Sequence, residues 1–235
     1  MTMLILAGGL GTRIRSLYPD RPKAIIPTAG YPFLVLLLTH YAAQGIEKFV
    51  ILTGYLAERL EAELSQWQFD ASIEFFSEPA LLGTGGAVLR CAENVDVGEI
   101  FMVANGDSMY PGTVFPDEES HLDWEATVFG VQVDDASNLG SMQIAPDGRL
   151  IAFREKQRGT GIANGGVYIF RKSFLDRFPR RTPLSMEHDV FPHALKEGAV
   201  IRTRIAAEAL LDIGTPESLG RASQFFEKYP VRRMP

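Results

Sequence analysis

An apolar segment that runs into a glycine-rich loop constrains the fold of this 235-residue chain more than any other feature. The run Met3–Ala7 contains only apolar residues, which predicts a strand buried on both faces. Gly8, Gly9 and Gly11 follow, and Arg13 ends the loop. Because glycine has no side chain, the backbone N–H groups of such a loop can wrap a phosphate chain, to which Arg13 adds positive charge. A tight strand-to-helix turn is the plainer interpretation of a single loop of this kind.

Spacing excludes two common nucleotide-binding loops. The dinucleotide fingerprint G-x-G-x-x-G does not fit, because position 14 is Ile14, and no G-K-[ST] follows as in a Walker loop. Lys23 comes ten residues after Arg13, between two prolines in an otherwise apolar segment. Most lysines are surface cations, but this setting favours a specific role for Lys23.

Strand and helix patterns alternate through the first half of the chain. Strands are predicted at 3–7, 48–52, 72–76 and 99–104, and helices at 32–44, 56–67 and 84–93. This alternation predicts an α/β fold with a mostly parallel sheet covered on both faces. In such sheets ligands bind beyond the carboxyl ends of the strands. The glycine loop, Gly83–Ala87 and Asp107 fall at such ends or just after them, so we expect them to converge.

The second half has several strands in succession instead of this alternation, predicted at 126–131, 141–144, 149–153, 166–170 and 200–205. Helices are predicted at 187–197 and 216–229. No Pro- or Ser-rich linker separates the halves, which indicates one domain over residues 1–235.

Composition narrows the environment and the partners. Net charge is −6, which argues against nucleic acid or an anionic membrane as a bulk partner. Cys91 is the single cysteine, so no internal disulfide can form and a reducing compartment fits. The N-terminus lacks a signal-peptide pattern, and the apolar run Phe33–Leu38 is too short to span a bilayer. We therefore expect a cytoplasmic protein.

Several motifs together resemble the sugar-1-phosphate nucleotidyltransferase family. They are residues 6–13 with Pro22-Lys23, Leu82–Ala87, Asn105-Gly106-Asp107 and Asp212–Pro216. Within that family the chain looks most like the D-glycero-α-D-manno-heptose 1-phosphate guanylyltransferases, through residues 44–46, 54–58, 164–166 and 187–192. The resemblance implies a Rossmann-like, three-layer α/β/α (GT-A-like) fold with a mainly parallel mixed sheet. It also implies a nucleotide-binding half, 1–110, and a sugar-binding half, 111–235.

The implied reaction is attack of a sugar 1-phosphate oxygen on the α-phosphorus of a nucleoside triphosphate, with release of pyrophosphate. A phosphate monoester is largely dianionic at neutral pH, with a second pKa of about 6, so its attack needs no general base. Charge neutralisation and positioning remain, and Mg²⁺ suits both because it binds one or two carboxylates together with phosphate oxygens. The resemblance assigns the metal to Asp107 and Asp212; an Asx-turn or a helix cap is the alternative role for Asp212.

The resemblance assigns the remaining roles residue by residue. Catalysis falls to Arg13, Lys23, Asp107 and Asp212, and sugar binding to Glu155, Lys156, Asn164 and Gly165. Nucleotide binding falls to Leu6, Ala7, Gly8, Gly9, Gly11, Thr12, Arg13, Lys23, Glu78, Gly83, Thr84, Gly85, Asn105 and Asp107.

Some alternatives stay open at this stage. A carboxylate at Glu78 favours guanine, because it can accept from both N1–H and the exocyclic amine. Uridylyl or thymidylyl transfer to another hexose-type phosphate stays open, as does a catalytically silent nucleotide-sugar sensor. Glu155-Lys156 could instead be a charged hairpin end, and His188 has no assigned role. We expect a monomer or a small homo-oligomer.

Overall fold

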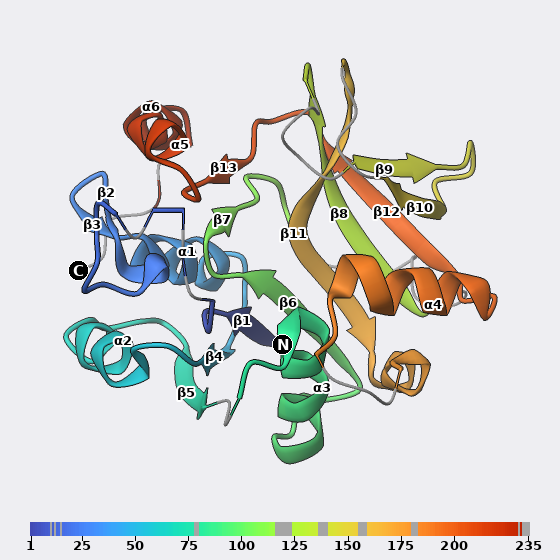
Figure 1. Cartoon of the computed structure of the whole chain (residues 1–235), viewed down its shortest axis with the longest axis horizontal. Coiled ribbons are helices and arrows are strands. Elements are labelled where there is room, and N and C mark those ends of the chain that lie inside the picture. The colour runs from blue at the N-terminus through green and yellow to red at the C-terminus, as the bar shows by residue number, and fades with distance from the viewer. Residues whose placement is uncertain are drawn as a thin grey trace.

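The structure is a computed structural model that describes residues 1–9, 11, 13–14, 16–77, 80–115, 124–135, 141–154, 159–179, 183–229 and 231. A central sheet is covered by helices on both sides, which gives the three layers of an α/β fold (Figure 1). The predicted fold class is therefore confirmed.

Within these residues nine strands form one sheet, in the order β10-β9-β11-β6-β1-β4-β5, with β8 beside β11 and β12 beside β8. In the first half β6, β1, β4 and β5 run parallel. The next strand, β11, is antiparallel to β6 and connects the two halves of the chain in one sheet. The bounds are β1 Thr2–Leu6, β4 Lys48–Thr53, β5 Ser72–Ser77, β6 Ile100–Asn105, β8 Ala126–Val133, β9 Ser141–Ile144, β10 Leu150–Arg154, β11 Gly161–Arg171 and β12 Ile201–Ala206.

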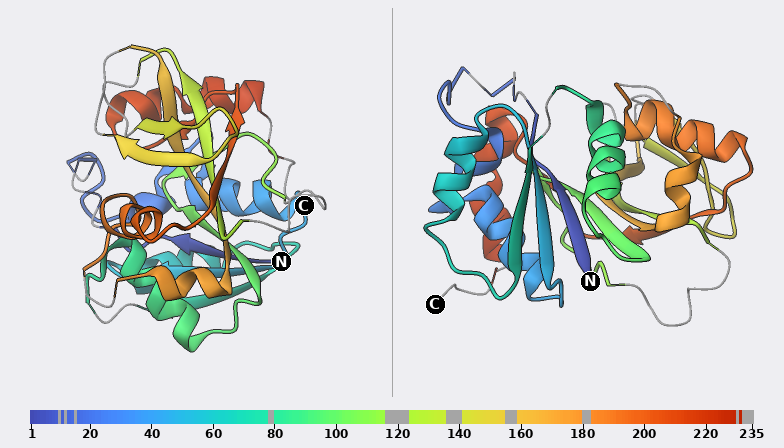
Figure 2. Two further views of the ribbon diagram at one scale, coloured as in Figure 1. Left: turned by 90° about the vertical axis from the view of Figure 1, so that its right-hand side faces the viewer. Right: turned by 90° about the horizontal axis from the view of Figure 1, so that it is seen from below.

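Helices pack on both faces of this sheet. The α-helices are α1 Phe33–Ala42, α2 Ala57–Leu64, α3 Gly83–Asn94, α4 Phe191–Lys196, α5 Pro216–Gly220 and α6 Ala222–Lys228. Shorter turns are the 3₁₀ segments η1 Lys23–Ile25 and η3 Lys172–Arg177, and the π-helical turn η4 Met186–Val190. Seen from below, α1 and α2 lie on one side of the parallel strands and α3 on the other (Figure 2). Among the described helices, none is long and apolar enough to cross a membrane.

The first strand shows why both faces must be covered. Met3 and Ile5 belong to the core cluster shared with α1, α2 and α6, whereas Leu4 belongs to the cluster shared with α3 and α4. All three side chains are fully buried. Alternate residues of a strand point to opposite faces, so a run that is apolar at every position fits only a sheet with two covered faces. The prediction for this strand is confirmed.

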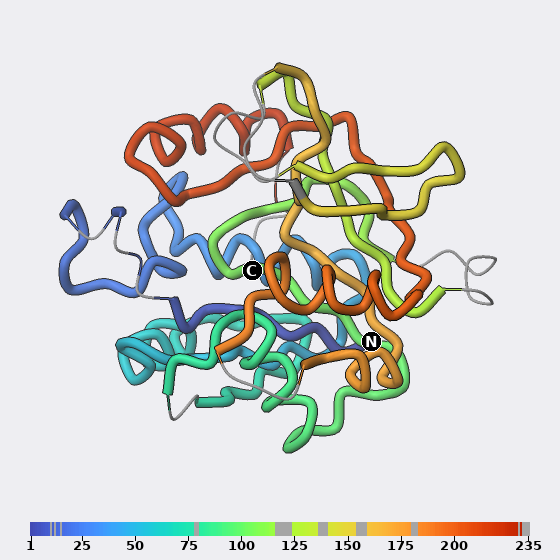
Figure 3. The backbone as a smooth tube through the Cα atoms, turned by 45° about the vertical axis from the view of Figure 1, so that its right-hand side comes forward, coloured from blue at the N-terminus to red at the C-terminus, as the bar shows by residue number. Residues whose placement is uncertain are grey.

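The backbone tube in Figure 3 shows the red C-terminal helices above the blue segment that carries α1.

Three predicted elements differ from the observed ones. The helix expected over 187–197 opens with the π-helical turn η4 and becomes α-helical only at Phe191. Pro192 has no N–H to donate, so the regular hydrogen-bond ladder cannot continue across this point. The helix expected over 216–229 is divided at Arg221 into α5 and α6, just after Gly220, a residue that disfavours helix. Strand β11 begins at Gly161 rather than Gly166.

Two short ribbons were not predicted. β2 (Pro27–Thr28) pairs with β3 (Tyr31–Pro32), and β7 (Ser108–Met109) pairs with β13 (Leu211–Asp212). Strands of two residues have no detectable periodicity, and the partners of the second ribbon lie about a hundred positions apart.

Candidate active site

The carboxyl ends of β1 and β6 border an open pocket of about 170 Å³. Gly106 donates its backbone N–H to the carbonyl of Leu6 over 3.0 Å, so the loops after these two strands meet directly. The pocket is lined by Leu6, Ala7, Gly9, Gly11, Arg13, Lys23, Ala24, Gly106, Asp107 and Gly214. The expected meeting of the glycine loop with Asp107 is therefore observed, whereas Gly83–Ala87, expected at the same place, is not among the residues that line this pocket.

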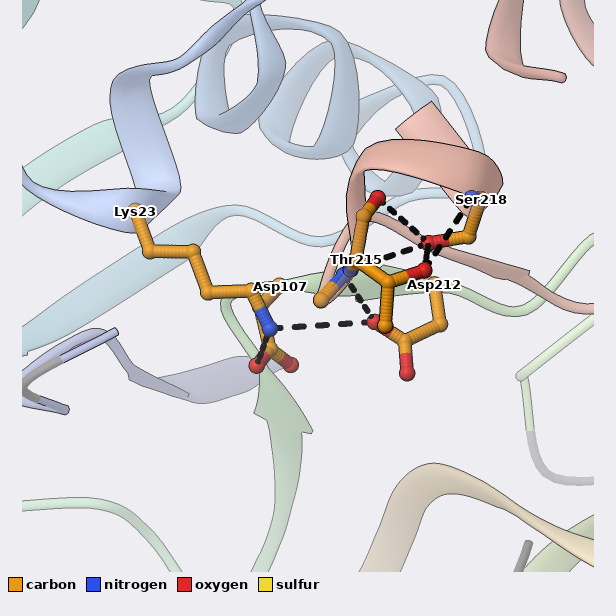
Figure 4. Close-up of polar contacts among 6 residues, drawn as sticks. Lys23, Asp107, Asp212, Thr215 and Ser218 are labelled. Carbon is orange, nitrogen blue, oxygen red and sulfur yellow. Dashed lines mark hydrogen bonds and ion pairs between the residues drawn. The ribbon is translucent and has the colours of Figure 1, made fainter. Parts of the chain in front are cut away.

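Lys23 reaches into the pocket from a firmly held backbone. It opens the turn η1, in which Ala24 and Ile25 are buried, and its own side chain is only 12% exposed. Its Nζ lies 2.6 Å from Oδ2 of Asp107 and 3.7 Å from Oδ1 of Asp212 (Figure 4). Two carboxylates and one ammonium leave a net negative charge at this point, which attracts a further cation.

The ribbon of β7 and β13 brings the two aspartates together. Asp212 is paired with Ser108, the residue after Asp107, and the N–H of Ile213 donates to the carbonyl of Asp107 over 3.0 Å. Since both carboxylates contact the same Nζ, their nearest oxygens can be no more than about 6.3 Å apart, the two contact distances taken together. Both side chains are 38–40% exposed, so an ion can approach them from solvent.

The geometry also clarifies the alternative roles of Asp212. Its Oδ1 accepts from the N–H of Gly214, which is an Asx-turn. It is not the cap of the closing helix: Thr215 caps α5 in a reciprocal capping box with Ser218 (Figure 4). The Asx-turn leaves Oδ2 of Asp212 for other partners, so the turn and a metal role are compatible.

Two glycines give the lysine its room. A Cβ at position 214 would lie 2.9 Å from Nζ of Lys23, and a Cβ at position 11 would lie 3.1 Å from its Cβ. Gly11 also has a φ of +58°, which side-chain-bearing residues rarely adopt. Arg13, which follows in the same loop, is exposed and lines the pocket.

The second glycine-rich stretch has a packing explanation. The N–H of Gly85 donates to the carbonyl of Leu184 over 2.9 Å, and Oγ1 of Thr84 accepts from the N–H of Met186 over 2.9 Å. A Cβ at position 83 would collide with the carbonyl of Leu184, and one at position 85 would lie 2.7 Å from Cγ2 of Val190. These contacts account for the glycines at both positions. Contact between this stretch and a nucleotide stays a prediction.

Asn105, Asn164 and Gly165 lie on the β11 side of the site. A Cβ at position 166, where φ is +69°, would lie 2.7 Å from Nδ2 of Asn105, so the turn after Asn164 packs on the end of β6. Gly165 is similarly confined, because a Cβ there would lie 2.9 Å from the carbonyl oxygen of Phe129. Asn164 forms hydrogen bonds with Tyr168 and Glu187, both 2.7 Å long.

Thr12, Glu78, Glu155 and Lys156 lie outside the described residues, so their predicted roles stay predictions. Ala24, Gly106 and Gly214 line the pocket although they are not among the predicted site residues. Ala24 and Gly106 are adjacent in sequence to Lys23 and Asp107, and Gly214 lies two residues after Asp212, so each lies beside a predicted site residue. Glu187 was noticed only as part of the 187–192 stretch, since nothing in the sequence places it beside Asn164.

The described residues provide an open site for a divalent ion rather than a closed site in which protein side chains supply every ligand. No group of three or more His, Cys, Asp or Glu side chains that could hold an ion occurs within the part of the chain that the structure describes. Two partly exposed carboxylates beside an open pocket suit a divalent ion such as Mg²⁺, which keeps several waters and takes substrate phosphates as its other ligands.

Comparison with known proteins agrees with this geometry. The profile of the family described as nucleotidyl transferase matches residues 2–229. The chain is 35% identical over 226 residues to a mannose-1-phosphate guanylyltransferase of Mycobacterium tuberculosis, covering 94% of this chain and 63% of that protein. It is 29% identical over 232 residues to a D-glycero-alpha-D-manno-heptose 1-phosphate guanylyltransferase of Aneurinibacillus thermoaerophilus, covering 97% of this chain and 100% of that protein. The chain thus spans less than two thirds of the first relative and all of the second.

Solved structures show the same fold. HddC from Yersinia pseudotuberculosis superposes with a TM-score of 0.85 at 32% identity, over 96% of this chain and 99% of that one. The same protein complexed with GMP-PN gives a TM-score of 0.84. The inositol-1-phosphate CTP transferase from T. maritima, at 19% identity, shares the fold with a TM-score of 0.80 over 96% of this chain and 93% of that one.

Proposed function

This chain belongs to the nucleotidyl transferase family, and we propose that it transfers a guanylyl group from GTP to a sugar 1-phosphate, releasing pyrophosphate. The observation that carries the proposal is the cluster of Lys23, Asp107 and Asp212 beside the glycine-loop pocket. Guanine is favoured because relatives of both sugar types are named guanylyltransferases and because HddC was solved with GMP-PN.

The reaction needs two polyanions to be brought together and oriented. In the proposal Arg13 and the backbone of the glycine loop hold the β- and γ-phosphates. Lys23, which contacts Asp107 in the free protein, binds the α-phosphate and the incoming sugar phosphate. The sugar phosphate is already dianionic, so no side chain has to remove a proton. Fixed cations that meet the charge of the transition state provide most of the acceleration in phosphoryl transfer.

Asp107 and Asp212 are the residues that would hold a divalent ion, which we propose is Mg²⁺. When bound, such an ion supplies charge neutralisation at the phosphates. Asp212 is positioned for this by the Asx-turn to Gly214, and Asp107 by the pairing of β7 with β13.

For the sugar we propose D-glycero-α-D-manno-heptose 1-phosphate first, because the relative named for transfer to this sugar phosphate matches the chain over its whole length. Mannose 1-phosphate is the second candidate, since the mycobacterial relative is 35% identical. Both names specify a manno-configured ring. We keep Glu155, Lys156, Asn164 and Gly165 as the proposed sugar contacts, with Glu78, Gly83–Gly85 and Asn105 on the nucleotide. A cytoplasmic monomer or small homo-oligomer remains the predicted form.

The test is a substrate matrix read by pyrophosphate release. GTP, UTP, dTTP and CTP are each combined with heptose, mannose and glucose 1-phosphates in the presence of Mg²⁺. We expect GTP with a manno-configured phosphate to give the fastest turnover, and Asp107→Asn to abolish most of it. Faster turnover with UTP or dTTP would overturn the base assignment, and no turnover with any pair would support a nucleotide-sugar sensor instead.

A further inference from the structure

The stretch Glu187–Pro192 has no part in the proposed reaction, yet it contacts the proposed sugar side. Asn164 lies in β11 where the pairing with β8 changes register. Glu187 lies on the π-helical turn η4, which continues into α4 beside β11 (Figures 1 and 3). The ring of Phe191 in α4 packs against that of Tyr168 in β11, with 5.3 Å between centroids.

The hydrogen bonds of Asn164 fix the orientation of its amide. Nδ2 donates to Oε1 of Glu187 and to the hydroxyl of Tyr168, each over 2.7 Å, and Oδ1 accepts from the N–H of Gly166 over 3.0 Å. An ionised carboxylate can only accept, so the nitrogen must face Glu187. Both N–H bonds of the amide are then used, and one lone pair of Oδ1 remains. Asn164 can therefore accept from a ligand hydroxyl but cannot donate to one.

The turn that carries Glu187 is held on both sides of the residue. The N–H of His188 donates to Oγ of Ser185 over 3.2 Å, and the N–H of Ser185 donates to Asp189 over 2.8 Å. Met186 is buried and bonded to Thr84 at the start of α3. Glu187 itself is half-buried, and the bond to Asn164 uses Oε1. The hydrogen bonds on either side of Glu187 therefore fix the turn from which its carboxylate reaches Asn164.

Tyr168 connects this network to the metal side of the site. Its hydroxyl is fully buried, and burial together with the negative charges of Glu187 and Asp107 raises its pKa above the ordinary value. Gly166, which is bonded to Asn164, packs on Asn105 and Ser108 of the segment that carries Asp107.

We propose that Glu187 is a positioning residue for the acceptor sugar: it holds the amide of Asn164 so that Oδ1 accepts from a ring hydroxyl of the sugar 1-phosphate. The proposal rests on the proposed function. It accounts for a charged residue in this turn, because an ionised carboxylate only accepts hydrogen bonds and so excludes the flipped amide, in which Oδ1 would face Glu187. Neither Asn164 nor Glu187 is among the proposed nucleotide contacts, so we expect the effect to be confined to the sugar.

The experiment compares Glu187→Ala, Glu187→Gln and Asn164→Ala with a control, His188→Ala, whose side chain is exposed on the same turn. Substrates are GTP and whichever of mannose or manno-heptose 1-phosphate the wild type uses faster. We expect Glu187→Ala to raise KM for the sugar phosphate about tenfold, as loss of one hydrogen bond would, with kcat and KM for GTP changed less than twofold. Asn164→Ala should match it, and the double variant should add little because the pair acts as a unit.

Glu187→Gln separates positioning from direct contact. Its amide oxygen can still accept from Asn164, and the N–H of Gly166 still holds Oδ1 in the same orientation. Glu187→Gln should therefore retain most of the wild-type affinity for the sugar phosphate, measured also by calorimetry without GTP. A loss in Glu187→Gln equal to that in Glu187→Ala, an unchanged KM in Glu187→Ala, or an equal rise in His188→Ala would each overturn the inference. An inactive wild type would contradict the proposed function, whereas an active wild type with these outcomes contradicts the inference alone.

Discussion

Replacing Lys23 by methionine should lower turnover but tighten the binding of a divalent ion at Asp107 and Asp212. The change keeps the length and apolar stem of a side chain that is 12% exposed, and removes the ammonium that lies 2.6 Å from Asp107. Turnover should fall by about a hundredfold or more, since removing one positioned donor from a site of charge development costs about that much. The fold should persist, because η1 is held by Ala24 and Ile25 rather than by the ammonium.

Binding of a divalent ion without nucleotide should instead tighten. The ammonium and the ion compete for the same carboxylate oxygens, Asp107 at 2.6 Å and Asp212 at 3.7 Å. Because both aspartates are more than a third exposed, the ammonium contact is worth about 1 kcal/mol, the upper end for exposed pairs. Removing it should lower the Kd for the ion about fivefold, at about 1.4 kcal/mol for each factor of ten.

The assay is calorimetric titration of Mg²⁺ into nucleotide-free protein, with steady-state kinetics on the same samples. Lys48→Met is the matched control: it removes the ammonium of another lysine–carboxylate pair, 2.9 Å from Glu74, at the opposite end of the parallel strands. Near-normal turnover in folded Lys23→Met would refute the catalytic role. Weaker ion binding in that variant than in wild type would refute the competition.

Three further predictions concern the two aspartates, Glu78 and His40. Asp107→Asn and Asp212→Asn should reduce kcat/KM by similar factors and the double variant by little more, since residues that act as one unit are not additive; a fully multiplicative double variant would contradict a shared ion. Glu78→Gln should weaken the preference for GTP over UTP by about 1–3 kcal/mol, the cost of an unpaired buried donor, as measured by the ratio of kcat/KM values; an unchanged ratio would move the base contact elsewhere. Burial lowers the pKa of His40 from 6.5, so the unfolded chain binds the extra proton and stability should fall as pH drops below 6.5. Denaturation at pH 7.5 and 5.5 should show a smaller difference in His40→Gln, and an equal difference would assign the pH effect to other groups.

The sequence was informative wherever one local pattern determines structure. The run Met3–Ala7 is apolar at every position, and β1 is buried on both faces as predicted. The rule that ligands bind beyond strand ends anticipated the pocket shared by the glycine loop and Asp107, because it needs only the order of elements. Long periodic segments and fold-level rules were thus enough to predict the architecture and the meeting of the glycine loop with Asp107.

Pairings between distant short segments could not be read from the sequence. The family resemblance assigned Asp107 and Asp212 to one metal, but no periodic pattern predicted the ribbon of β7 and β13, two residues on each side, that brings them together. The bond between Asn164 and Glu187 likewise joins a strand bulge to a π-helical turn, two irregular features without a periodic signature. Such contacts depend on the packed fold, so no local pattern in the sequence predicts them.

The site also depends on both halves of the chain at several separate places. Asp212 returns to the pocket from beyond the proposed sugar-binding strands, and Gly214 bounds the space of Lys23. Leu184 lies so close to Gly83 that no side chain fits there, and a Cβ at position 85 would lie 2.7 Å from Cγ2 of Val190. Each contact ties a loop of the proposed nucleotide half to a segment of the proposed sugar half. A displacement of the sugar-side strands should therefore move Asp212, the proposed metal ligand, as well, which would give sugar binding a physical route to the reacting phosphates.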